Sequence, residues 1–83
     1  MNKTNIKDKL KEFLIEEFTI SKDLLKDDMS LIEGGWLDSY GIVNLAMFIE
    51  KSFGIEITLE ELTPEQLDTI ETISEFIQKK ISN

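Results

Sequence analysis

Residues 39–53, with the sequence SYGIVNLAMFIEKSF, carry the strongest structural signal in this chain. Apolar residues recur there every three or four positions, which predicts a helix from Ser39 to Phe53. We expect Ser39 to be the N-cap of this helix and Gly54 to end it, because serine and glycine are favoured at those two places. One stripe of the helix is apolar enough to face a core, and it contains Ile42, Leu45, Ala46, Ile49 and Phe53.

A second apolar stripe lies on another side of the same helix and contains Tyr40, Val43 and Met47. A chain of 83 residues is too small to bury one helix on every side, so we expect this stripe to be at least partly exposed. An exposed apolar strip among acidic residues is typical of a surface that binds a partner. The alternatives are that the preceding loop or a second copy of the chain covers it.

Apolar spacing also predicts a first helix over roughly residues 4–18, whose stripe contains Ile6, Leu10, Phe13, Leu14 and Phe18. The pair Thr63-Pro64 predicts the start of a short helix that ends near Leu67. A last helix follows, and its stripe contains Ile70, Ile73, Phe76, Ile77 and Ile81. We expect Asp68 to cap this last helix as a pair with Glu71, three residues further on.

The connection between the first two helices, residues 19–38, is called the long loop below. It exceeds the usual length of a connection, so we expect its own apolar side chains to hold it against the core. The candidates are Ile20, Leu24, Leu31 and Leu37, and Gly34-Gly35 predicts a tight turn near its end. The sequence therefore predicts an all-α fold in one domain over residues 1–83. That domain is a small four-helix bundle with three main helices and one short third helix.

Charge and missing residue types exclude most functional classes. The formal net charge is −8, so we expect neither nucleic acid nor an anionic membrane as a partner. The chain has no Cys and no His, and all nine basic residues are lysines, so it lacks the usual nucleophiles and zinc ligands. The acidic residues of the long loop do not follow the spacing of a calcium-binding EF-hand. We predict a protein without catalytic residues or a metal site.

Other sequence features bear on the protein's location and partners. The first residues do not form a signal-peptide pattern, and the apolar stretches are too short for a bilayer, which predicts a cytoplasmic location. Residues 28–78 hold eleven acidic residues and a single lysine. This acidic region is either a solvated face that keeps a small domain in solution or a docking surface for basic partners.

Ser39 stands where a glycine-kinked loop enters the helix, so its hydroxyl should be accessible to another protein. A phosphodiester attached there would face the free N–H groups of the first turn and the positive end of the helix dipole. The alternative for an isolated serine at this place is plain N-capping.

The segment Gly35-Trp36-Leu37-Asp38-Ser39-Tyr40 resembles the signature of the acyl and peptidyl carrier protein family, in which an Asp-Ser-apolar motif opens the second helix of a four-helix bundle. The resemblance covers nearly the whole chain, and the other residues that carry it are Val43, Leu45, Ile49, Glu50, Phe53-Gly54 and Ile55-Glu56-Ile57.

This resemblance implies that a phosphopantetheinyl transferase attaches 4′-phosphopantetheine from coenzyme A to Ser39. The thiol of that arm would hold acyl intermediates as thioesters and present them to enzymes of fatty-acid, polyketide or related biosynthesis. The protein itself would be a monomer that catalyses nothing. Its implied partners are the transferase, an acyl- or aminoacyl-loading enzyme and downstream synthases with basic and apolar docking patches. The positions that match the family's partner-binding face are Asp38, Tyr40, Val43, Met47, Glu50, Glu60 and Glu61.

Some positions depart from the pattern of fatty-acid carriers. Gly41 and Asn44 stand where acidic residues are common, and Lys51 replaces another acid, so we expect docking to depend more on apolar contact. The same departures leave open a second interpretation, a discrete aminoacyl or peptidyl carrier protein that an adenylating enzyme loads. A third interpretation is a small interaction domain that carries no arm and in which Ser39 is only a helix cap.

Overall fold

The computed structural model describes residues 2–82 and consists of helices joined by loops, which confirms the predicted all-α class. Its helices are α1 (Lys3–Phe18), α2 (Ser39–Phe53), α3 (Pro64–Leu67) and α4 (Ile70–Ser82). Two 3₁₀ turns accompany them, η1 (Lys22–Leu24) in the long loop and η2 (Leu59–Glu61) between α2 and α3. Among the described residues, no helix combines the length and the apolar character needed to cross a membrane.

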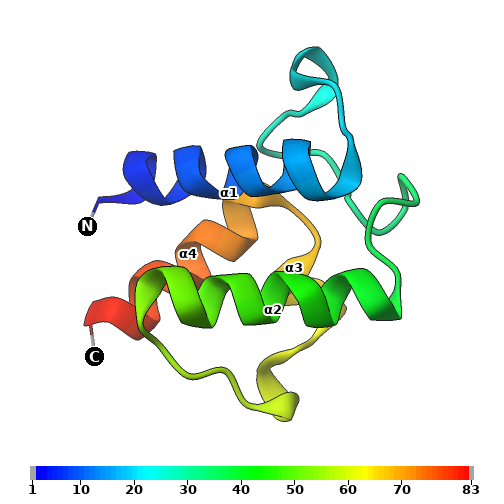
Figure 1. Ribbon diagram of the computed structural model, residues 1–83. Coiled ribbons are helices and arrows are strands. Elements are labelled where there is room, and N and C mark those ends of the chain that lie inside the picture. Colours follow the sequence, from blue (N-terminus) through cyan, green and yellow to red (C-terminus); the bar gives the residue numbers. More distant parts are fainter. Residues whose placement is uncertain (1, 83) are drawn as a thin grey trace.

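The helices form a small bundle in which α4 packs against each of the other three. Figure 1 shows α1 and α2 running in opposite directions, with α4 crossing behind them. Both chain ends lie on one side of the bundle. The end of α1, the long loop and the start of α2 lie on the opposite side, so any chemistry at the start of α2 occurs far from the termini.

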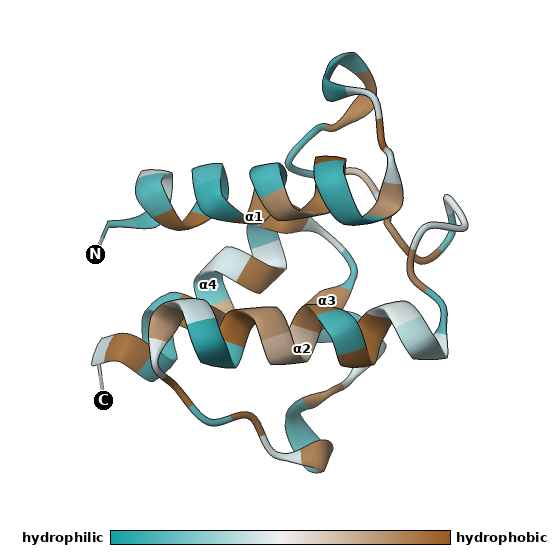
Figure 2. Cartoon of the chain, in the orientation of Figure 1, coloured by the Kyte–Doolittle hydropathy of each residue, from teal (hydrophilic) through white to brown (hydrophobic). Residues whose placement is uncertain are grey.

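The core consists of most residues of the predicted stripes, but the prediction for Ile81 is wrong, since this residue near the end of α4 is 36% exposed. Figure 2 shows the apolar side of α1 turned toward the other helices and its polar side turned outward. The fully buried apolar residues come from all four helices and the long loop, namely Ile6, Leu10, Leu14, Leu31, Leu45, Ile49, Leu67, Ile70, Ile73 and Ile77. Burial of such side chains contributes about 1.5–3 kcal/mol each, which is the main stabilisation of a domain this small.

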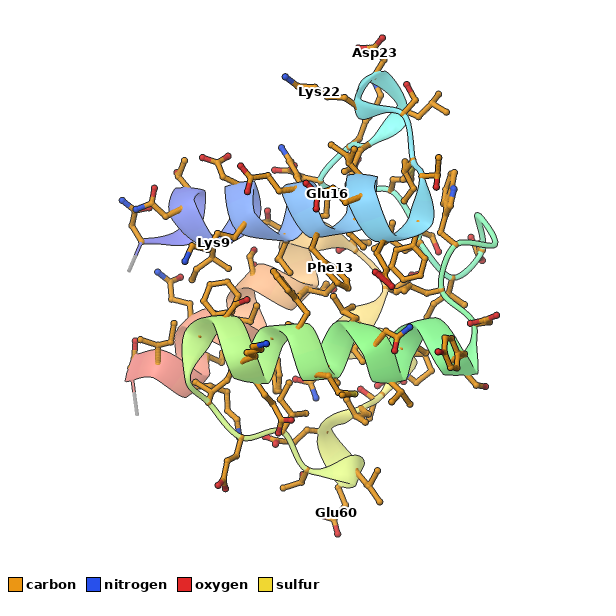
Figure 3. The ribbon with its side chains drawn as sticks, in the orientation of Figure 1. Lys9, Phe13, Glu16, Lys22, Asp23 and Glu60 are labelled. Carbon is orange, nitrogen blue, oxygen red and sulfur yellow. The ribbon has the colours of Figure 1, made fainter. Side chains whose placement is uncertain are left out.

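Aromatic rings bridge α1 and α2, and we call the four residues involved, Phe13, Phe18, Phe48 and Phe53, the aromatic seam. The rings of Phe13 and Phe48 stack with their centroids 4.2 Å apart. Phe18 meets Phe13 edge-on at 6.0 Å, and Phe53 meets Phe48 edge-on at 6.3 Å. Figure 3 shows Phe13 pointing from α1 toward α2. The seam therefore joins the two helices through large side chains rather than through close backbone packing.

The long loop lies against the core through three of the four predicted residues, because Ile20, Leu31 and Leu37 are buried. The prediction for Leu24 is wrong, since its side chain is 58% exposed and Leu25 is buried instead. The cause is the η1 turn, in which the Leu25 amide donates to the Lys22 carbonyl at 3.3 Å. Because of this tight turn, Leu25 faces the core in place of Leu24.

Asp68 anchors the middle of the long loop. Its backbone carbonyl accepts a hydrogen bond from the Leu31 amide at 2.7 Å, and its carboxylate accepts one from the Ser30 hydroxyl at 2.6 Å. The predicted pairing of Asp68 with Glu71 as a helix cap is therefore wrong. Thr69 and Thr72 cap α4 instead, because each side-chain hydroxyl accepts a hydrogen bond from the other's amide, at 3.0 and 3.2 Å.

Glu71 belongs to a cluster of ion pairs between α1, the long loop and α4. Lys3 and Lys7 both contact its carboxylate, and Lys7 also contacts Asp27 at 2.9 Å. Lys11 reaches the same Asp27 at 3.0 Å. Hydrogen bonds from Lys3 and Lys7 lower the pKa of Glu71, and those from Lys7 and Lys11 lower the pKa of Asp27. The cluster thus joins three parts of the chain that are distant in sequence.

We predict that this cluster makes stability depend on pH in the acidic range. The pKa values of Glu71 and Asp27 are lower in the folded chain, so the unfolded chain binds more protons near pH 4 and stability falls on acidification. Glu71→Gln should lower the free energy of unfolding at neutral pH, and this difference should shrink as the pH falls below the usual range of a glutamate carboxyl, because the folded-state pKa of Glu71 is lowered. Urea unfolding followed by circular dichroism measures it.

The matched control for this prediction is Glu60→Gln, because Glu60 is exposed on η2 and points away from the bundle (Figure 3). Glu60→Gln removes the same charge from a chain that is already acidic, without removing an ion pair. Equal free energies of unfolding for the two variants at neutral pH would contradict a stabilising role for the cluster.

Candidate functional site

The sequence analysis gave Ser39 two roles at the start of α2, to cap the helix and to present an accessible hydroxyl. In the structure, two different residues have these roles. Asp38 is the N-cap, with extended backbone angles, and its Oδ1 accepts a hydrogen bond from the Gly41 amide at 2.7 Å. Its backbone carbonyl accepts another from the Ile42 amide at 2.9 Å. The prediction that Ser39 is the N-cap is wrong, because Ser39 is already the first helical residue. A residue with helical backbone angles cannot turn its side chain back onto the first-turn amides as a cap does.

The Ser39 side chain is exposed and is not needed to begin the helix. Amides at the first helical positions have no partner within a helix, and the positive end of the helix dipole lies there. A phosphate ester on this hydroxyl would therefore meet favourable partial charges, although the chain has no arginine. The residues present at this site fit a phosphate-linked group.

The second apolar stripe of α2 is open to solvent. Its exposed fractions are 76% for Tyr40, 50% for Val43 and 62% for Met47. This confirms the expected exposure and shows that the long loop does not cover the stripe. Because the stripe begins one residue after Ser39, the accessible hydroxyl and the exposed apolar strip form one continuous surface.

The four acidic residues predicted for the partner-binding face divide into two pairs. Asp38 and Glu60 are exposed. Glu50 and Glu61 are partly buried and bind the segment after α2: the Glu50 carboxylate accepts from the Ile57 amide at 2.8 Å, and that of Glu61 accepts from the Thr58 amide at 2.9 Å. Lys80 also contacts Glu61 at 2.9 Å, and this bond is the main reason that the pKa of Glu61 is lowered.

One exposed residue near this surface lay outside the sequence-based predictions. Leu59, which precedes Glu60 in η2, is 88% exposed. Its neighbours along the chain are polar or charged, so no apolar stripe marked it. Only the capping of η2 by Thr58 and Glu61, which holds the turn against Lys80, shows that the leucine points outward.

An open groove lies beside Ser39, between the end of α1 and the start of α2. Its lining residues are Glu17, Phe18, Trp36, Asp38, Tyr40, Gly41 and Asn44. Two glycines let aromatic rings lie close to the backbone here. A Cβ on Gly41 would lie 3.0 Å from a Phe18 ring carbon, and one on Gly34 would overlap the Trp36 ring. No sequence-based prediction gave Trp36 a neighbour, because its contacts depend on how the long loop folds.

Comparisons with known proteins agree on one kind of protein. A family model described as "Phosphopantetheine attachment site" matches residues 8–77. The acyl carrier protein of Buchnera aphidicola subsp. Acyrthosiphon pisum (strain Tuc7) is 36% identical over 76 residues, which cover 92% of each chain. The acyl carrier protein of Thermosynechococcus vestitus (strain NIES-2133 / IAM M-273 / BP-1) is 30% identical over 82 residues, which cover 99% of each chain.

A solved structure is also similar. It is a chain in the "Crystal structure of FAD-dependent dehydrogenase", with a TM-score of 0.73 and 28% sequence identity. The match covers 82% of the present chain and 97% of that chain, so the two chains are of similar size.

We predict that Asp38→Ala and Ser39→Ala differ in their effect on stability. Asp38→Ala removes the cap and should lower the free energy of unfolding by about 1 kcal/mol. Ser39→Ala removes an exposed hydroxyl that caps nothing and should change it by less than about 0.5 kcal/mol. Urea unfolding of both variants beside the unchanged protein measures the difference. A larger loss for Ser39→Ala than for Asp38→Ala would show that the hydroxyl is the cap after all.

Proposed function

This chain belongs to the acyl carrier protein family, whose members have a phosphopantetheine attachment site, and from that premise we propose that it carries acyl groups on an arm attached to Ser39. Family membership implies a covalently attached 4′-phosphopantetheine group. The observation that supports Ser39 as the attachment residue is its exposed hydroxyl at the first position of α2, beside a cap that Asp38 supplies. The recipients would be enzymes of fatty-acid, polyketide or related biosynthesis.

Attachment requires a phosphopantetheinyl transferase as partner and coenzyme A as donor. The Ser39 oxygen forms a new bond to the phosphorus that bears the pantetheine, its O–H bond breaks, and the proton passes to a base of the transferase. The bond from that phosphorus to the rest of coenzyme A breaks, and adenosine 3′,5′-bisphosphate leaves. When bound, the group supplies a terminal thiol that holds an acyl group as a thioester. The chain itself supplies an accessible oxygen and a helix end that favours the phosphate.

Partner enzymes would dock on the exposed stripe of α2. Tyr40, Val43 and Met47 offer an apolar strip next to Ser39, and the net charge of −8 would attract basic partners over longer distances. Glu50 and Glu61 already bind neighbouring parts of the chain, so they are less available for charge contacts. We therefore propose that apolar contact contributes most of the docking energy. We expect the carrier to act as a monomer in the cytoplasm.

A second candidate is an aminoacyl or peptidyl carrier that an adenylating enzyme loads. Gly41 and Asn44 occupy positions that are often acidic in fatty-acid carriers. Loading by an ATP-dependent ligase with amino acids would favour this candidate, and loading by an acyltransferase with acyl-CoA would favour the first.

We predict that the purified chain gains the mass of one phosphopantetheine when it is incubated with coenzyme A, Mg²⁺ and a transferase of broad specificity. Intact-mass spectrometry measures the gain. Ser39→Ala is the control and should show no gain while its circular dichroism stays unchanged. A folded chain that gains no mass would contradict the carrier function and favour an acidic interaction domain in which Ser39 carries nothing.

We also predict that Met47→Glu slows phosphopantetheinylation or acyl transfer without unfolding the protein. Met47 is 62% exposed, so the fold should tolerate the change, whereas a charge within an apolar contact should lower kcat/KM by about tenfold, or about 1.4 kcal/mol. Leu24→Glu is the matched control, because Leu24 is 58% exposed but lies in η1, away from α2. Equal kinetics for the two variants would remove the docking role of the stripe.

A further inference from the structure

We propose that the groove beside Ser39 binds the half of the phosphopantetheine arm nearest the phosphate, in the same molecule that carries the arm. This inference rests on the proposed attachment at Ser39 and assigns a role to residues outside the exposed stripe of α2. The groove is lined by three segments that the fold brings together, namely the end of α1, the end of the long loop and the first turns of α2 (Figure 1).

The position of the groove favours the arm as its occupant. Ser39 lies between two lining residues, Asp38 and Tyr40, so an attached arm begins at the edge of the groove. Asn44 lies five residues further along α2, about 7.5 Å along the helix axis and about 140° around it, so the arm would curve around the helix past Tyr40 to reach it. Because the arm is tethered, its effective concentration at the groove is high, and weak contacts are enough to hold it there.

The apolar part of the groove matches the branched part of the arm. Next to its phosphate, the arm carries a carbon with two methyl groups. The groove presents the rings of Phe18 and Trp36, which close contacts with Gly41 and Gly34 hold in place. Two methyl groups packed against these rings would bury apolar surface on both sides.

The polar part of the groove matches the first amide and hydroxyl of the arm. Within residues 2–82, neither the Trp36 indole N–H nor the Asn44 side-chain amide has a hydrogen-bond partner. Neither of these polar groups is fully buried. Both residues line the groove, and both groups are donors that a ligand in the groove could accept from. The carboxylates of Glu17 and Asp38 border the groove and disfavour an anionic ligand, whereas the amide portion of the arm is uncharged.

Trp36 is the single tryptophan of the chain, so it reports on the groove directly. The experiment compares isotope-labelled protein before and after complete phosphopantetheinylation, with loading verified by intact mass. We expect the Trp36 indole N–H and the Asn44 amide resonances to move on loading. We also expect nuclear Overhauser effects between the indole ring protons and the two methyl groups of the arm.

Asn44→Ala tests the polar contact, with Asn5→Ala as its matched control, since Asn5 is exposed near the start of α1 on the opposite side of the bundle. We expect the Overhauser effects to weaken in Asn44→Ala and to persist in Asn5→Ala, with complete loading of both.

The outcomes that would overturn the inference are distinct. A loaded protein whose only changes lie at the amides of the first turn of α2, without effects between methyl groups and indole, places the arm in solvent and leaves the proposed function intact. An indole resonance that moves only when the transferase is bound assigns the groove to the partner enzyme and overturns the inference. A chain that cannot be loaded at Ser39 overturns both this inference and the proposed function.

Discussion

The hydrogen bonds between Asp68 and the long loop determine where α2 begins, and the rest of the site depends on that point. Asp68 lies between α3 and α4, and its carbonyl and carboxylate hold the amide of Leu31 and the hydroxyl of Ser30. The Leu31 side chain is fully buried, and its carbonyl accepts the amides of Trp36 and Leu37, each at 3.1 Å. Leu37 is the last residue in these contacts, and it directly precedes Asp38, which caps α2, and Ser39, which carries the exposed hydroxyl. A loop of this length without such an anchor would have no defined exit.

Asp38 and Ser39 have separate roles at the start of α2, and this separation leaves the Ser39 hydroxyl accessible for the proposed attachment. A hydroxyl that caps a helix is turned toward the backbone, whereas the carboxylate of Asp38 caps α2 and leaves Ser39 facing solvent. The acidic residues show a similar division. Glu50 and Glu61 stabilise the segment after α2, while the exposed surface near Ser39 is mainly apolar. In the proposed function, the net charge would attract partners from a distance and the apolar stripe would provide the contact.

The aromatic seam explains how one small bundle can have a core, an exposed stripe and a groove. Stacked rings keep α1 and α2 together while their backbones stay apart, and Phe18 at the end of the seam lies against Gly41. A Cβ at Gly41 would lie 3.0 Å from a Phe18 ring carbon, so glycine favours this close contact, although it weakens a helix by up to about 1 kcal/mol relative to alanine. Gly41 thus allows the Phe18 ring to lie close to α2, and both residues line the groove next to Ser39.

The sequence by itself determined the helices, the buried stripes, the exposed stripe of α2 and the Asp-Ser motif, because periodicity and composition are properties of a single segment. The tertiary structure alone decided between neighbours of similar chemistry. Asp38 rather than Ser39 caps α2, and Leu25 rather than Leu24 is buried. Asp68 binds the long loop instead of capping α4. The folded backbone decides each of these choices, through the η1 turn for Leu25, through the first turn of α2 for Asp38 and through contact with the distant long loop for Asp68.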